Sequence, residues 1–187
     1  MGSAGLDGCL IVTGMPGAGK TTVTALAARL LPRAAQVKGD TVSYMILSGR
    51  VGFQQEPAAE AQRQDVLCNL NMATLANNFV DYDFTVLMDT VVADRAELDC
   101  LLGALGNRPV RMVILAPGIE ACRYRNSIRD PIERFDFDGY ERLEADMRRD
   151  LATLGWWFDT SALTPADTAA RLVREAAERA PLLSPAR

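Results

Sequence analysis

An eight-residue run near the start of the chain has the residue types and spacing of a phosphate-binding loop. The run Gly14 to Thr21 matches G-x-x-x-x-G-K-[ST] and stands between an apolar stretch and a segment with helical periodicity. Glycines at these positions let the backbone turn so that consecutive N–H groups face an anion. Lys20 is then expected on the β- and γ-phosphates, and the Thr21 hydroxyl is expected to hold Mg²⁺. A glycine-rich turn without a ligand is the less favoured alternative.

Nucleotide contacts are expected from this loop, from the start of the helix after it, and from the loop before the last helix. The predicted positions are Gly14, Met15, Pro16, Gly17, Ala18, Gly19, Lys20, Thr21, Thr22, Thr160 and Ser161. The last two lie in residues 159–164, which follow the last predicted strand and are expected to pass beside the adenine base. Capping of the next helix would explain the same Ser and Thr residues equally well.

Two aspartates at strand ends are candidates for metal binding and proton transfer. Asp89 closes the apolar run 84–88, a pattern typical of an acid that orders Mg²⁺ directly or through water; a turn or capping role is the alternative. The chain contains no histidine, so a carboxylate must remove the proton from an alcohol acceptor. Asp40 follows the second predicted strand and is our candidate general base. It would also suit the cap of a helix that begins at Thr41.

Arginines are concentrated after the fourth predicted strand. Four of them, from Arg123 to Arg134, fall within twelve residues. Phosphoryl transfer spreads negative charge over the phosphate oxygens, and guanidinium groups on a closing segment stabilise that charge. We expect a small arginine-rich lid over residues 123–138, in which Arg125 and Arg129 share one helix face and act in catalysis. A solvated arginine-rich helix is the alternative.

The polar stretch between the second strand and the long helix is the expected acceptor site. Residues 43–57 contain two glycines among polar side chains and come just after Asp40. We predict acceptor contacts from Asp40, Arg50 and Gln54, with Arg50 placed to grip an anionic or hydroxyl-rich molecule. Lys38 either tunes the Asp40 carboxylate or caps the strand edge. No motif in this stretch specifies the acceptor.

Apolar runs and helical patterns alternate along the chain, which predicts βα units around a parallel sheet. The predicted strands are 9–13, 35–39, 84–88, 110–116 and 156–159. The predicted helices are 20–31, 41–48, 57–80, 95–105, 119–128, 139–154 and 165–179, with Asp94 and Thr164 as N-caps. The expected fold is α/β, a three-layer sandwich with a five-stranded parallel sheet. Ligands should bind beyond the carboxyl ends of its strands.

Length and composition suit a single domain spanning 1–187. The chain has 187 residues, of which 49% are hydrophobic, and its ends, 1–8 and 181–187, are expected to fray. The net charge of −4 disfavours nucleic acid as a partner. No secretion signal or membrane-spanning run is indicated, so the cytoplasm is the expected location. The four cysteines lack a C-x-x-C pair and are expected as free thiols, and a homo-oligomer is compatible with the composition.

These motifs together resemble the P-loop phosphotransferases typified by chloramphenicol phosphotransferase, with gluconate, shikimate and zeta-toxin kinases as wider relatives. The resemblance covers most of the chain and rests on the loop 14–21, the run 37–40, the run 88–92 and the run 159–161. It implies a P-loop NTPase fold, ATP and Mg²⁺ as cofactors, and Asp40 as base. The chain departs from the family at Thr90, where the family pattern has a second acid, so no role for a second carboxylate is carried over.

The expected function is transfer of the γ-phosphoryl group of ATP to a hydroxyl of a small molecule, with an antibiotic or other natural product as one candidate acceptor. A polynucleotide or nucleotide-sugar kinase would use the same parts. An ATP-hydrolysing switch module is the alternative from another class, and it would need only an oriented water in place of a base. Choosing between ATP and GTP lies beyond the sequence.

Overall fold

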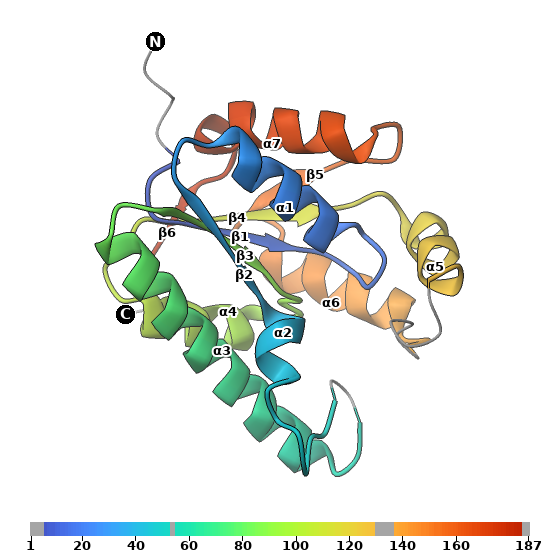
Figure 1. Cartoon of the computed structure of the whole chain (residues 1–187). Helices are drawn as coiled ribbons and strands as arrows, with labels where there is room; N and C mark the ends of the chain where they lie inside the picture. The colour runs from blue at the N-terminus through green and yellow to red at the C-terminus, as the bar shows by residue number, and fades with distance from the viewer. Residues whose placement is uncertain (1–5, 53–54, 130–136, 185–187) are drawn as a thin grey trace.

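A central β-sheet is covered by helices on both faces in the computed structural model, which describes residues 6–52, 55–129 and 137–184 (Figure 1). One face carries α1 (Lys20–Leu30) and α7 (Pro165–Arg179); the other carries α3 (Ala58–Asp81), α4 (Arg95–Leu105) and α6 (Tyr140–Leu151). The three-layer α/β fold predicted from the sequence is therefore confirmed.

The main strands are parallel and run in the order β2-β3-β1-β4-β5. Their bounds are β1 Cys9–Thr13, β2 Ala34–Lys38, β3 Thr85–Asp89, β4 Val110–Leu115 and β5 Trp156–Phe158. Every residue of β1 is buried, as expected for a central strand covered on both faces. In the register of β2 with β3, Lys38 lies beside Asp89, so the residues that follow these two strands begin side by side at the same edge of the sheet.

Residues near both chain ends contact the sheet. Leu182–Leu183 form a short strand, β6, antiparallel to β4, so the sheet has a sixth strand that was not predicted. At the other end, Leu6 is 7% exposed and belongs to the core. Its carbonyl oxygen accepts a hydrogen bond from the Thr85 hydroxyl at 2.7 Å. The fraying expected for 1–8 and 181–187 remains a prediction.

The helices follow the predicted pattern closely, except for α2. Helix α2 spans Gly39–Ser43 and α5 spans Ile119–Ser127. The expected helix 41–48 therefore begins earlier and ends earlier, and Asp40 lies inside its first turn rather than capping it. The capping alternative for Asp40 is thus wrong. By contrast, the predicted caps of α4 and α7 are confirmed: the Asp94 carboxylate accepts from the Glu97 N–H at 3.0 Å, and the Thr164 hydroxyl accepts from the Asp167 N–H at 3.1 Å.

Residues 44–52 form a loop whose backbone hydrogen-bonds to a side chain of α3. The Gln64 side chain accepts from the Val51 N–H and donates to the Gly49 carbonyl, each at 2.8 Å. Gly49 has a φ of 76°, a conformation that glycine adopts without strain. The side chain of Arg50 is thereby placed on a loop whose two neighbouring residues are anchored to α3.

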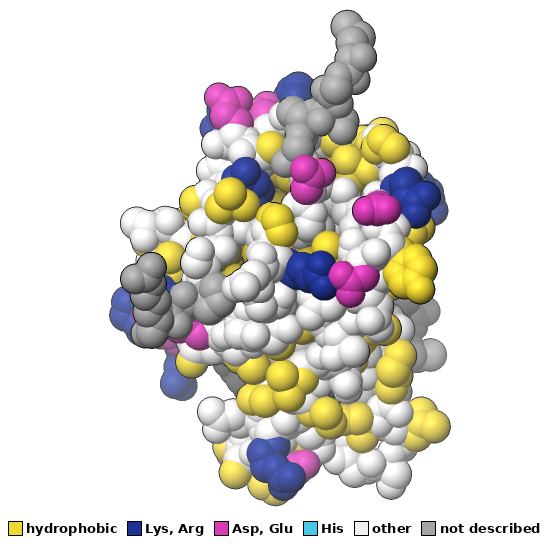
Figure 2. Space-filling model, turned by 90° about the vertical axis from the view of Figure 1, so that its left-hand side faces the viewer, with side chains coloured by type: hydrophobic (Ala, Val, Ile, Leu, Met, Phe, Trp, Pro, Cys, Tyr) yellow, Lys and Arg dark blue, Asp and Glu magenta, His cyan; other side chains and the backbone are white. Residues whose placement is uncertain are grey.

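Exposed apolar side chains lie along the outer surface of α3. On the face that is on the left in Figure 1, hydrophobic side chains stand out among polar atoms in Figure 2. The large exposed ones on α3 are Val66, Leu67, Leu70, Leu75 and Phe79. A homo-oligomer remains a prediction. No helix in the described ranges combines the length and the apolar character that crossing a membrane demands.

Candidate active site

The loop between β1 and α1 has the backbone shape of a phosphate cradle. Gly17 and Gly19 have φ angles of 85° and 95°, which side chains other than glycine rarely permit. A Cβ added to Gly17 would lie 2.2 Å from the carbonyl oxygen of Cys122 in α5, so a larger residue would push the loop and α5 apart. Gly19 immediately precedes α1 and has no side chain to cap it. The first N–H groups of α1 are thus left for an anion.

The amino group of Lys20 curls back over this loop. Its Nζ donates to the carbonyl oxygens of Gly14, at 2.8 Å, and Met15, at 3.2 Å. Burial lowers the pKa of Lys20, and the negative charges of Asp89 and Asp40 oppose this effect. The cation is therefore held at the mouth of the cradle, where a polyphosphate would replace the two carbonyls as its partner.

Thr21 and Asp89 meet on the inner side of the same loop. Asp89 is only 6% exposed, and burial raises its pKa, while the Lys20 charge and a hydrogen bond from Thr21 lower it. A hydroxyl and a carboxylate are hard oxygen donors of the kind that Mg²⁺ uses, together with phosphate oxygens and water. The predicted Mg²⁺ ligands are thus brought together. Within the described ranges, no group of three or more acidic, Cys or His residues could hold a metal by itself.

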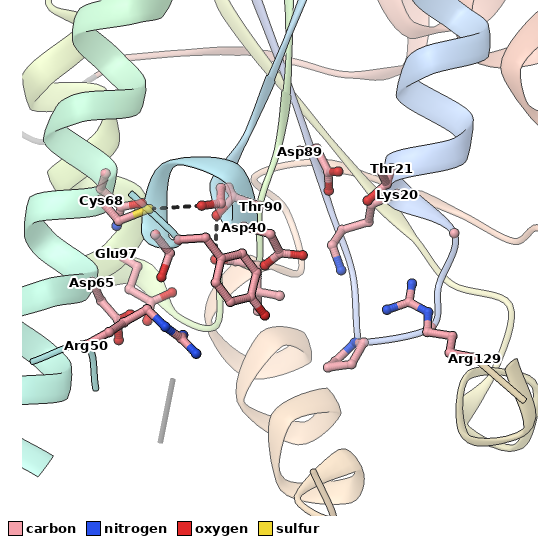
Figure 3. A pocket seen from close by; sticks show the side chains of 18 residues that line it. Lys20, Thr21, Asp40, Arg50, Asp65, Cys68, Asp89, Thr90, Glu97 and Arg129 are labelled. Carbon is pink, nitrogen blue, oxygen red and sulfur yellow. Dashed lines mark hydrogen bonds between the residues drawn. The ribbon is translucent and has the colours of Figure 1, made fainter. Parts of the chain in front are cut away.

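Asp40 lies between the nucleotide residues and a second set of polar side chains. Figure 3 shows its carboxylate between Lys20, Thr21 and Asp89 on one side and a group from α3 and α4 on the other. One pocket contains all of these side chains. An exposed carboxylate in this position can reach both a bound phosphate and an acceptor molecule, as a general base must.

A second pocket lies on the outer side of the phosphate loop. Its lining includes Thr22, Arg125, Arg129 and Thr160, and Arg129 also lines the first pocket. The Thr160 hydroxyl is buried and has no hydrogen-bond partner among the described residues, which marks it as a group that a ligand can satisfy. Ser161 is exposed, and its N–H donates to the Asp159 carboxylate at 2.9 Å. Of the two residues predicted beside the nucleotide base, Thr160 lines this pocket and Ser161 does not.

The arginine-rich segment divides into residues with different surroundings. Arg123 donates to both carboxylate oxygens of Glu141, at 2.7 and 2.8 Å, and lies over the Tyr140 ring, so it fastens α5 to α6. Arg125 and Arg129 both line the second pocket instead. Helix α5 ends at Ser127, so Arg129 lies beyond it, and the prediction that the two arginines share one helix face is wrong. Much of the predicted lid, 130–136, falls outside the described residues, as does the predicted acceptor residue Gln54. The lid remains a prediction.

The part of the first pocket beyond Asp40 is here called the acceptor chamber. It is lined by Tyr44, Arg50, Asp65, Cys68, Asn69, Thr90 and Glu97. Of these, only Arg50 was predicted to contact the acceptor. Asp65, Cys68 and Asn69 were missed, although their spacing places them on one face of a helix. Glu97 resembles an ordinary helix-capping partner in the sequence, and it does accept from the Ala93 N–H at 2.7 Å.

Burial changes the acidity of the two chamber carboxylates. It raises the pKa of Asp65 to about 6. It also raises the pKa of Glu97 to about 7, with the Ala93 N–H opposing the shift and the negative charges of Asp94 and Asp65 adding to it. Thr90, at the position where the resembled family has an acid, lines the same chamber. The chamber therefore takes its acidic character from α3 and α4 rather than from the end of β3.

Comparison with known proteins places the fold but not the family. No family model matches the chain, and a search of curated proteins finds no match. Among solved structures, the tunicamycin resistance protein of Deinococcus radiodurans has a TM-score of 0.64 at 16% identity, covering 89% of this chain and 93% of its own. The Mycobacterium tuberculosis APS kinase with AMPPNP and APS has a TM-score of 0.60 at 17% identity, covering 89% and 95%. A sugar kinase from a Janibacter species has a TM-score of 0.60 at 17% identity, covering 90% and 94%.

The chain therefore has the three-layer α/β fold of P-loop NTPases, and two of these three similar structures are kinases by name. At these identities the likeness concerns the fold. The particular resemblance to chloramphenicol phosphotransferase remains a prediction.

Proposed function

We propose that this protein is an ATP-dependent kinase that transfers the γ-phosphoryl group to a hydroxyl of a small molecule. The observation that carries the proposal is the position of Asp40, in one pocket with the phosphate loop on one side and the acceptor chamber on the other. A hydrolytic switch needs only an oriented water and no chamber for a second molecule. The pocket therefore supports a kinase over a switch.

The residues of the phosphate loop suit ATP and Mg²⁺. The cradle of N–H groups and Lys20 would hold the phosphates, Thr21 and Asp89 would hold the metal, and the Thr160 hydroxyl would gain a partner on the nucleotide. When bound, Mg²⁺–ATP supplies the activated phosphoryl group and neutralises part of its charge.

Asp40 then acts on the acceptor. Its carboxylate accepts the proton of the acceptor hydroxyl as that oxygen attacks phosphorus, and ADP is the leaving group. Arg125 and Arg129, on the opposite side of the loop, stabilise the negative charge on the transferring group. The acceptor chamber orients the hydroxyl and limits water, which would otherwise compete as the nucleophile.

An antibiotic or other natural product is the acceptor that we favour, with self-resistance or tailoring as the biological role. The fold shared with a tunicamycin resistance protein is compatible with this proposal. A polynucleotide or nucleotide-sugar acceptor is disfavoured, because its phosphates would face Asp65 and Glu97 in the chamber.

The test is mass spectrometry of hydroxylated antibiotics, nucleosides and sugars incubated with protein, ATP and Mg²⁺. Wild-type protein should add the mass of one phosphoryl group to a member of the panel, and Asp40→Asn should not. Asp99→Asn, an aspartate of α4 paired with Arg95 outside the pockets, is the matched control and should behave as wild type. Consumption of ATP without any modified acceptor, at equal rates in wild type and Asp40→Asn, would favour the switch.

A further inference from the structure

The acceptor chamber contains two carboxylates that form no ion pair with the residues that the structure describes. Asp65 comes from α3 and Glu97 from α4, two helices that pack against each other on one face of the sheet. Burial is the main cause of the raised pKa of Glu97, and the negative charge of Asp65 adds to it. Figure 3 shows the two side chains close together at the end of the pocket away from Asp89. Two acids placed together in a half-buried chamber create a strongly negative local potential.

The one arginine of the chamber does not neutralise them. The guanidinium group of Arg50 lies over the Tyr44 ring, 4.5 Å from its centroid. Within the part of the chain that the structure describes, Arg50 forms no ion pair with Asp65, Glu97 or Asp40. Three carboxylates therefore face the acceptor side of the pocket, and one arginine lines it with them.

An amide side chain beside the carboxylates forms no hydrogen bond with the residues that the structure describes. Asn69 lies one helical turn after Asp65, lines the chamber and is 7% exposed. On a helix the backbone groups bond to each other, so it is the side chain of Asn69 that faces the chamber. No hydrogen bond to that side chain is found among the described residues. The amide of Asn69 is therefore free to hydrogen-bond a ligand or water in the chamber.

We infer that the acceptor carries a protonated amine, which binds between Asp65 and Glu97, while Asn69 hydrogen-bonds a polar group beside it. This inference rests on the proposed kinase function and specifies its substrate class as an amine-bearing alcohol, such as an amino sugar or aminocyclitol. An ammonium group supplies N–H donors that the Asp65 and Glu97 carboxylates can accept, and its positive charge offsets theirs. A metal ion is the weaker occupant, because no metal-binding group of three acidic, Cys or His residues is found within the described ranges.

The inference is tested by binding and by phosphorylation, measured separately. Calorimetry at pH 8 with ADP and Mg²⁺ compares kanamycin, neomycin and glucosamine with their fully N-acetylated forms, which keep the hydroxyls and lose the charge. Mass spectrometry of the same pairs with ATP, together with neutral sugars, then reports transfer. The variants are Asp65→Asn, Glu97→Gln and the two combined; Asp99→Asn on α4 is the matched control.

An amine that binds wild type and the control at least tenfold more tightly than its acetylated form, with the preference lost in the double variant, supports the inference. Equal binding of both forms, an unchanged preference in the double variant, or binding of neutral compounds only would overturn it. The two proposals fail in different ways. Phosphorylation of neutral acceptors alone would support the kinase proposal and contradict the amine-binding proposal. Selective amine binding without transfer to any acceptor would support the amine-binding proposal and contradict the kinase proposal.

Discussion

The nucleotide half and the acceptor half of the pocket are built in different ways. The nucleotide half is a single loop, residues 14–21, whose shape is fixed by glycines and by the strand and helix on either side. The acceptor half is assembled from the loop after α2, the middle of α3 and the start of α4. The first uses backbone N–H groups, which vary little with sequence, and the second uses side chains. The acceptor half is therefore the part that can change specificity without changing the reaction.

Loss of Lys20 should have the largest effect on the nucleotide half. Lys20→Ala removes the buried cation at the mouth of the cradle, so nucleotide affinity should fall by about 100-fold. Titration with ADP and Mg²⁺ measures this loss. Lys38→Ala, which changes the other lysine of the chain, is the control and should keep most of the affinity. Similar losses in both variants would mean that general charge, and not the cradle, holds the nucleotide.

The arginines beside the loop should affect turnover more than nucleotide affinity. Arg125→Ala and Arg129→Ala should each lower turnover by about tenfold or more, because these groups act on charge that develops during transfer. Steady-state kinetics and nucleotide titration separate the two effects. Arg123→Ala is the control: it loses the contact with Glu141, so it should lower thermal stability and leave the turnover of folded protein nearly unchanged. Unchanged turnover in all three variants would mean that Arg125 and Arg129 have no catalytic role and only form a solvated surface.

Acidic pH should weaken the acceptor half selectively. Below about pH 6, Asp65 and Glu97 are both protonated, because burial raises their pKa to about 6 and about 7. The KM for an amine-bearing acceptor should therefore rise by roughly tenfold from pH 8 to pH 5.5. The KM for ATP serves as the internal control and should change much less. Parallel changes of the two KM values would contradict a separate acidic chamber.

The smallest expected effect is a gain in stability when a chamber carboxylate is neutralised. Folding raises the pKa of Asp65, so the unfolded chain loses its proton first and stability falls as pH rises from about 4 to 6. At pH 8, Asp65→Asn should therefore raise the free energy of unfolding by about 1 kcal/mol and the midpoint temperature by roughly 3 °C. At pH 4 it should change both quantities little. Thermal melts at both values measure the difference. A loss of stability at pH 8 would mean that Asp65 has a structural partner.

The difference between the halves also explains what could be predicted from the sequence. The strands, most helices and the phosphate loop follow from local patterns, such as apolar runs and the glycines around Lys20. Asp65 and Asn69 give no such signal, because only the packing of α3 against α4 decides which face of a long helix meets the pocket. The strand Leu182–Leu183 was missed, and the bounds of α2 were wrong, for the same reason. In each case distant contacts outweighed local preference.

The most direct test of the account is a comparison of nucleotide binding and phosphoryl transfer in Asp40→Asn. Asp40 joins the two halves, and it should act on the acceptor proton without holding the phosphates. We predict that Asp40→Asn binds ADP with Mg²⁺ within about threefold of wild type while transfer falls by at least about 100-fold. A loss of nucleotide affinity as large as the loss of transfer, or transfer at the wild-type rate, would contradict the assignment of Asp40 as the base between the two halves.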